Sequence, residues 1–142
     1  MRFELLTLGG TKYQGEVAEV VLRTTDGELG VLPGHEPLTA IVVAGPVTVQ
    51  PRAGATEHFV SFGGLLEVRD NVARLLADEA EHADDLVHEE IEAALAKAHE
   101  LKEAAQSRHE IHRAQELIDR HTVRLEVARI RRHHRERPGQ PR

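Results

Sequence analysis

The chain changes its local chemistry abruptly near residue 84, and this break limits the folds that it can adopt. Ten of its eleven glycines and four of its six prolines precede that point, and neither residue occurs from 84 to 137. Gly and Pro mark turns and end regular elements. The first part should therefore consist of short elements separated by turns, and the second part of long helices.

The first part has the pattern of a β-sheet. Residues 2–8 and 47–50 alternate between apolar and polar side chains, as half-buried strands do. Further strands are predicted at 17–24, 58–62, 65–68 and 72–76. Many short strands at this spacing indicate an antiparallel sandwich or barrel. Asp70-Asn71 is interpreted as a hairpin turn, and Gly63-Gly64 as a bulge or a close approach of two backbones.

The second part has a helical period. Apolar residues recur every three or four positions in two series, which indicates two amphipathic helices: Val87, Ile91, Ala94, Ala98, Leu101 and Ala105, then Ile111, Ala114, Ile118, His121, Leu125 and Ala128. Each helix would have about 20 residues and a length of about 30 Å. An antiparallel hairpin that bends near residues 106–108 is the simplest arrangement. Because no Gly or Pro marks the bend, one continuous helix is the alternative.

The predicted contact between these helices is rich in alanine. Alanine buries little area, and apolar burial contributes roughly 25 cal/mol per Å². A hairpin held in this way should be a unit of low stability, able to rearrange while the β domain stays folded.

Composition excludes several kinds of chemistry. The chain has no cysteine, which rules out disulfides, thiolate metal sites and a cysteine nucleophile. Its two serines, Ser61 and Ser107, lie outside any nucleophile motif. The ten histidines invite a metal interpretation, but His109 and His112 lack the i, i+4 spacing of a zinc helix because position 113 is Arg. We therefore expect no catalytic residue, no metal and no cofactor. No membrane span or signal peptide is expected either.

Charge is distributed unevenly along the chain. Net charge is −3 over residues 1–77, −8 over 78–105 and +5 over 106–142. The basic run 129–137 could bind nucleic acid, dock on an acidic protein surface, or form a solvated tail.

Residues 26–38 carry three glycines and two prolines in thirteen positions. Gly permits positive φ and Pro fixes φ near −65°, so such a run is predicted to form a tightly bent loop of one defined shape. This loop would hold Glu28 and His35 in place for a contact.

Four blocks carry a family resemblance: residues 27–38, 45–47, 63–68 and 76–81. In order and spacing they resemble the epsilon subunit of F-type ATP synthases over essentially the whole chain. The resemblance implies a flattened antiparallel β-sandwich of about ten strands over 1–83, a regulatory helical hairpin over 84–135, and a disordered basic tail over 136–142.

The resemblance also implies a function. Such subunits are non-catalytic rotor components of the central stalk, which bind the gamma subunit and the ring of c subunits. This places the chain on the cytoplasmic side of a bacterial plasma membrane, attached only through the complex and without nucleic acid. Glu28 and His35 match positions that face the c-ring; turn stabilisation is the alternative role for both.

In bacterial members the hairpin can open into the catalytic head, contact the alpha and beta subunits transiently, and oppose ATP hydrolysis. The basic second helix offers five candidates for that contact: Arg120, Arg124, Arg129, Arg131 and Arg132. Some members also bind ATP where the first helix begins, through a pattern whose Asp and Arg positions are Val87 and Glu90 here. Glu90 would repel phosphate, so weak or absent ATP binding is predicted.

One competing hypothesis belongs to a different class. A stand-alone β-sandwich binding module with a helical oligomerisation tail would have the same layout, and it would purify without ATP synthase subunits.

Overall fold

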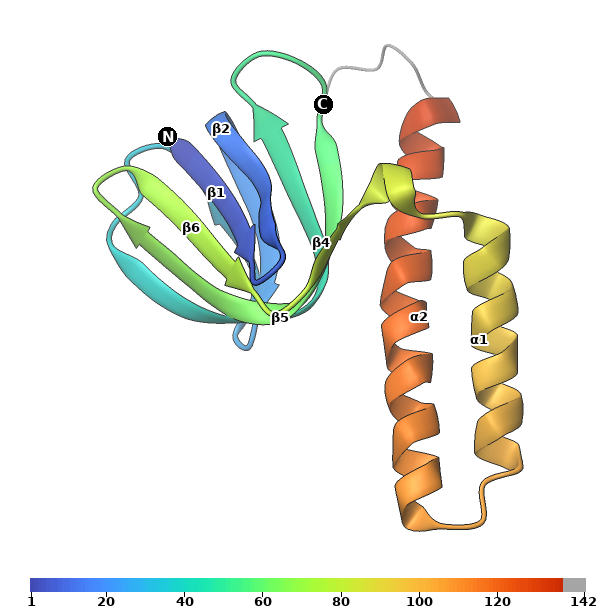
Figure 1. Ribbon diagram of the computed structural model, residues 1–142. Helices are drawn as coiled ribbons and strands as arrows, with labels where there is room; N and C mark the ends of the chain where they lie inside the picture. Colours follow the sequence, from blue (N-terminus) through green and yellow to red (C-terminus); the bar gives the residue numbers. More distant parts are fainter. Residues whose placement is uncertain (137–142) are drawn as a thin grey trace. The chain divides into compact units, whose positions relative to one another are not determined.

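The computed structural model describes residues 1–136 and divides into two compact units, one of residues 1–83 and one that begins at Asp84 (Figure 1). Each unit has its own secondary structure. The first is entirely β apart from the start of a short 3-10 helix, and the second is helical.

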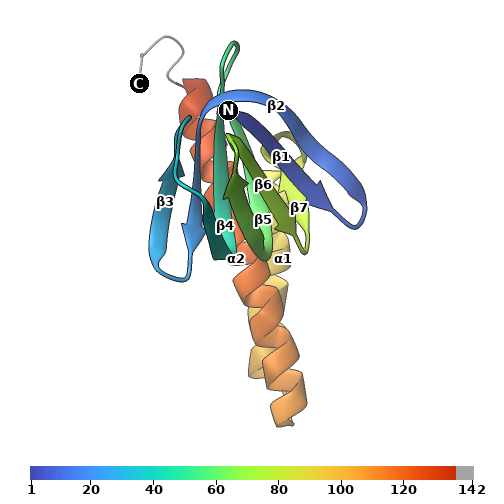
Figure 2. The same ribbon diagram turned by 90° about the vertical axis from the view of Figure 1, so that its left-hand side faces the viewer.

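The described residues of the first unit form seven strands: β1 (Arg2–Thr7), β2 (Gly10–Thr24), β3 (Gly27–Val31), β4 (Leu38–Pro51), β5 (Glu57–Arg69), β6 (Val72–Ala77) and β7 (Ala80–His82). They pair in the order β1-β6-β5-β4-β2-β3, and β7 pairs with β5. Because β1 also pairs with β2, five of them close a ring, seen as the curled sheet of Figure 2. The pairings among these strands are antiparallel except for the parallel pair β1–β6.

The predicted sandwich is confirmed, although the strand count is seven rather than about ten. Three strands have 13 to 15 residues, well above the usual five or six. Two of them change partners along their length. The first half of β2 pairs with β1 and its second half with β3 and β4, while β5 pairs first with β7 and then with β6. If each of the three long strands is counted as two, the seven strands become ten, the number that was predicted.

The prediction of a loop over the whole of 26–38 is wrong in part. Residues Gly27–Val31 form the edge strand β3, and only the stretch after it is irregular. Gly27 has a φ of 115° and allows the chain to turn there, after which Leu29 and Val31 pair with Leu22 and Val20. Val31 is fully buried, so burial of its side chain favours the strand over a loop.

The core of the first unit follows from the alternation of its strands. The side chains that point inward are completely buried, among them Phe3, Leu5, Val20, Leu66 and Leu75. Tyr13 packs against this cluster, with ring centroids 5.8 Å from Phe3 and 6.0 Å from Phe59.

The second unit contains a helical hairpin, so the alternative of one continuous helix is wrong. The 3-10 helix η1 (Ala83–Asp85) leads to α1 (His88–Glu103), and α2 (Arg108–Glu136) follows. Figure 1 shows the two helices side by side, running in opposite directions. Their lengths are 16 and 29 residues, rather than about 20 each.

Hydrogen bonds at the bend explain why α2 starts where it does. The Glu110 amide donates to Ser107 Oγ (3.2 Å), and the Gln106 amide donates to Glu110 Oε2 (2.8 Å). This resembles a capping box, which begins a helix without Gly or Pro. The sequence signal is Ser107 followed three residues later by Glu110.

The predicted apolar contact of the hairpin is buried only in part. Ile91, Ala98, Ala114 and Ile118 are buried, whereas Leu101 at the far end of α1 is 49% exposed. Of the tail predicted at 136–142, Glu136 is the last residue of α2, and the rest lies outside the described residues. None of the helices described is long and apolar enough to cross a membrane.

Candidate docking surface

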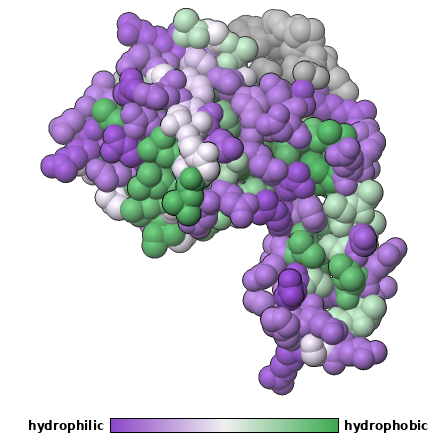
Figure 3. All heavy atoms as spheres, in the orientation of Figure 1, coloured by the Kyte–Doolittle hydropathy of each residue, from purple (hydrophilic) through white to green (hydrophobic). Residues whose placement is uncertain are grey.

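An apolar row crosses the outer face of the β-sandwich. Strand pairing places four side chains in register on adjacent strands: Leu6 of β1, Leu76 of β6, Leu65 of β5 and Ile41 of β4. The last three are 48%, 40% and 61% exposed, and Figure 3 shows a hydrophobic area over this part of the first unit. We call these four residues the apolar row. Contiguous apolar surface of this kind typically marks an interaction site.

The strand period explains why these apolar side chains face outward. In β6, Ala73, Leu75 and Ala77 point into the core while Arg74 and Leu76 point out. Moving the register by one residue would exchange the two sets, so the core fixes the apolar row in place.

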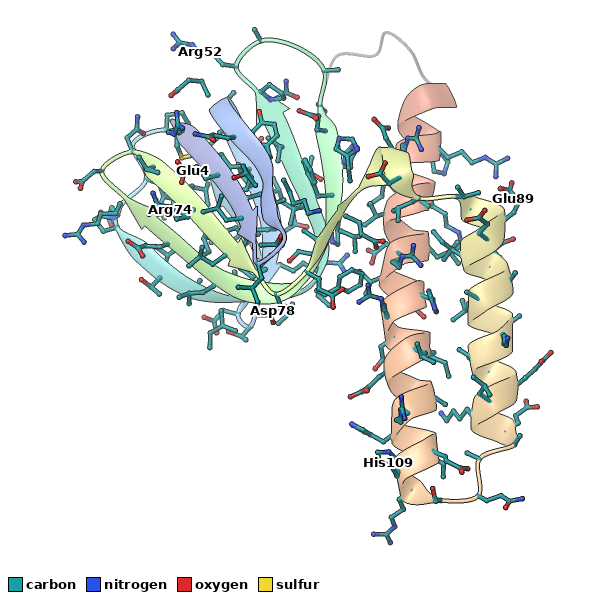
Figure 4. The ribbon with its side chains drawn as sticks, in the orientation of Figure 1. Glu4, Arg52, Arg74, Asp78, Glu89 and His109 are labelled. Atoms are coloured by element: carbon teal, nitrogen blue, oxygen red, sulfur yellow. The ribbon has the colours of Figure 1, made fainter. Side chains whose placement is uncertain are left out.

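A charged row lies beside the apolar row, two residues along each strand. It consists of Glu4, Arg74 and Glu67, which are in register on β1, β6 and β5. Arg74 Nε donates to Glu4 Oε2 (2.8 Å), and Arg2 Nε donates to Glu4 Oε1 (3.0 Å). The hydrogen bond from Arg74 is the main reason that the pKa of Glu4 lies below its ordinary value, with a smaller effect from Arg2. Figure 4 shows Glu4 and Arg74 next to each other.

Leu8 extends this surface at the turn between β1 and β2. Its side chain is fully exposed, and the turn that carries it is held by two hydrogen bonds of the Thr7 hydroxyl. Thr7 Oγ1 accepts from the Gly9 amide and donates to the Gly10 carbonyl, each at 3.1 Å. A fully exposed leucine in an ordered turn adds to the apolar area that a partner could cover.

The structure places Glu28 and His35 at opposite ends of β3 rather than in one cluster. Glu28 pairs with Arg23 beside the β2–β3 turn, and His35 lies in the loop after the strand. The His35 amide donates to the Leu32 carbonyl (3.1 Å), and its ring Nδ1 lies 2.7 Å from the Glu36 carbonyl. His35 thus has a contact that stabilises the turn, while Glu28 is exposed on the edge strand.

The loop is also tied to the neighbouring hairpin turn. The Gly34 amide donates to Asn71 Oδ1 (3.0 Å). Asp70 and Asn71 have φ of 51° and 61°, as a type I′ turn requires, which confirms the predicted hairpin. This link between residues far apart in sequence had no signal in the chain itself.

The five arginine candidates lie along α2 in different surroundings. Arg129 and Arg132 line a surface hollow of about 430 Å³ with His88 and His133. Arg124 Nη1 lies 3.2 Å from His121 Nδ1, and Arg120 is half-buried one turn away. Arg131 Nε is 2.8 Å from Asp84 Oδ1, a partner that sequence reasoning missed.

The residues described offer little to a metal ion or nucleotide. Over 1–136, no group of three or more His, Asp or Glu side chains could hold a metal. Val87 is the residue that caps α1, and no side chain caps the helix by a hydrogen bond there. The acidic residue of the ATP-binding pattern is therefore missing at the position where it would act, and weak or absent ATP binding stays a prediction.

These features define a class: a β-sandwich with an exposed docking face, followed by a helical hairpin. Residues 1–83 match the family model of the ATP synthase delta/epsilon chain, beta-sandwich domain. The chain is 38% identical over 108 residues to the ATP synthase epsilon chain of Streptomyces griseus, covering 76% of this chain and 87% of that one. It is 33% identical over 132 residues to the epsilon chain of Herpetosiphon aurantiacus, covering 93% and 96%.

A solved structure has the same fold. A chain of the Euglena gracilis mitochondrial ATP synthase, from an OSCP/F1/c-ring assembly, aligns with a TM-score of 0.68 at 25% identity over 89% of this chain and 76% of that chain. The protein therefore belongs to the ATP synthase epsilon chains, and it is a non-catalytic stalk subunit of that complex.

Proposed function

We propose that this chain is the central-stalk rotor subunit of a bacterial F-type ATP synthase. It couples rotation of the c-ring to the catalytic head and opposes ATP hydrolysis through its helical hairpin. It lies on the cytoplasmic side of the plasma membrane and is held there only by the complex. The observation that carries this proposal is the apolar row beside the charged row on a non-catalytic β-sandwich.

The apolar row is the docking face for the gamma subunit. A complementary surface that covers this row removes from water the exposed apolar area of Leu76, Leu65 and Ile41. Burial of that area is the main favourable term in such an association. The charged row at its border sets orientation, since charges at the rim of an interface contribute specificity more than affinity. Leu8 at the adjacent turn adds an anchor.

The edge strand and its loop meet the c-ring. Strand β3 pairs only with β2 among the strands described, so its outer edge and the Glu28 side chain are open to a partner. His35 is held by the Glu36 carbonyl at the far end. Glu28 and His35 are thus two polar groups held at a distance from each other at this edge of the sheet. Such an arrangement supports a surface contact that transmits torque and needs no deep pocket.

The test replaces an exposed leucine of the apolar row in the complete complex. Leu65→Asp should reduce co-purification of gamma with this chain more than tenfold, because a carboxylate would be buried without a partner. The matched control is Leu101→Asp, a leucine of similar exposure on α1, which should retain gamma. Retention of gamma by a folded Leu65→Asp chain would overturn the assignment of this face.

A further inference from the structure

The base of the hairpin carries an ion pair between two elements of the second unit. Arg131 Nε on α2 lies 2.8 Å from Asp84 Oδ1 in η1, within the distance of an ion pair. The Arg131 side chain is only 20% exposed, whereas Asp84 is 64% exposed. The pair is thus partly shielded on one side and reaches water on the other.

This pair joins parts of the chain that must separate when the hairpin opens. Asp84 lies just before α1, and Arg131 lies near the end of α2. Asp84 leads into one arm of the hairpin and Arg131 lies on the other, so α2 cannot move away from the start of α1 without separating the pair. The apolar contact between the arms is weak, because alanines form much of it and Leu101 at the far end is half exposed. Because that contact is weak, even the small contribution of one ion pair at the base shifts the balance between the closed and the open hairpin.

We propose that Asp84–Arg131 is a latch that holds the hairpin closed and keeps this guanidinium away from the acidic groups of the catalytic head. Arg131 reaches Asp84 only in the closed hairpin and an acidic group of the catalytic head only in the open one, so the two contacts belong to exclusive states. The proposal rests on the proposed inhibitory function and adds its regulation. A partly exposed pair is worth little, which suits a switch that must open.

The first experiment measures opening in the full chain. The protein has no cysteine, so Ala98→Cys, at a buried position of α1, provides a single thiol whose labelling rate follows the open fraction. Asp84→Asn and Arg131→Gln should each raise that rate about two- to fivefold, and the double variant should raise it no further. The charge-swapped pair Asp84→Arg with Arg131→Asp should restore the slow rate.

Matched controls remove a charge nearby while leaving the pair intact. Asp85→Asn changes the next acid of η1, and Arg129→Gln changes an exposed arginine of α2; both should label at the parental rate. Additive effects of Asp84→Asn and Arg131→Gln, or rates equal to those of the controls, would overturn the latch.

The second experiment separates the latch from the inhibitory function, using ATP hydrolysis by the complete complex. Asp84→Asn removes this ion pair and should strengthen inhibition, whereas Arg131→Gln also opens the hairpin but removes the docking group and should weaken it. If both variants open the hairpin and neither changes hydrolysis, the inhibitory function fails while the latch stands.

Discussion

Gly64 occupies a position at which the backbones of β5 and β6 leave no room for a side chain. A Cβ added there would lie 2.2 Å from the Leu76 carbonyl oxygen and 2.8 Å from Ala77 Cα. Neither atom belongs to a side chain that could turn away. We expect Gly64→Ala to lower the free energy of unfolding by about 2–4 kcal/mol, measured by urea unfolding of the full chain.

Two other glycines provide a graded comparison. Gly63 has a φ of 101° but only ordinary contacts around its Cβ position, so Gly63→Ala should cost about 1–2 kcal/mol. Gly9 has its nearest neighbour, Thr7 Oγ1, at 3.6 Å, and Gly9→Ala should be close to neutral. Equal losses at all three positions would show that backbone crowding at Gly64 is not the cause.

Glu4 makes the stability of the β-sandwich depend on acid pH. Hydrogen bonds from Arg74 and then Arg2 lower its pKa below the ordinary value of 4.5. The folded state thus binds the proton more weakly than the unfolded state. The stabilisation is fully present above pH 4.5 and is lost as the pH falls through the lowered pKa. Glu4→Gln should therefore unfold at less urea than the wild type at pH 7, with a difference that shrinks as the pH falls through the lowered pKa of Glu4; an equal difference at every pH would contradict this.

Local signals in the sequence identified the elements whose structure is decided locally. The Asp70-Asn71 turn and the close approach of two backbones, found at Gly64, both follow from residue types with special backbone freedom, and both predictions are confirmed. The strand Gly27–Val31 was not predicted, because its glycines are typical of a loop. It is a strand because it pairs with β2, and that pairing depends on residues elsewhere in the chain.

Glu28 on β3 and His35 in the loop after it lead to a prediction about coupling. Replacing Glu28 and His35 by Ala together should leave the fold intact, since neither side chain is buried, but should weaken ATP synthesis driven by a proton gradient by several-fold. Synthesis by membranes that carry the double variant is the measurement, with hydrolysis by the detached catalytic head as control. Wild-type synthesis in the double variant would count against a contact with the c-ring.

The arrangement of elements within each unit was less accessible from sequence than the elements themselves. The ring of strands closes through the parallel pairing of Arg2 with Val72 and of Leu6 with Leu76. Hairpin turns in the sequence predict antiparallel neighbours and could not predict this parallel pair. The apolar row exists only because this pairing brings Leu6 and Leu76 into register. In the same way, the contact of Asp84 with Arg131 depends on how the hairpin folds. The candidate residues of the docking face could be named only once these long-range pairings were known.

The division into two units leads to a prediction for the whole molecule. The buried apolar cluster of the β-sandwich runs from Met1 to Ala80, so deleting residues 86–142 removes none of its members. The shortened chain should fold, bind gamma and assemble. ATP hydrolysis by the complex should rise several-fold, because the arm that opposes rotation is gone. Failure to assemble would show that the β-sandwich depends on the helices, whereas normal assembly with unchanged hydrolysis would refute the inhibitory role and leave the stalk role in place.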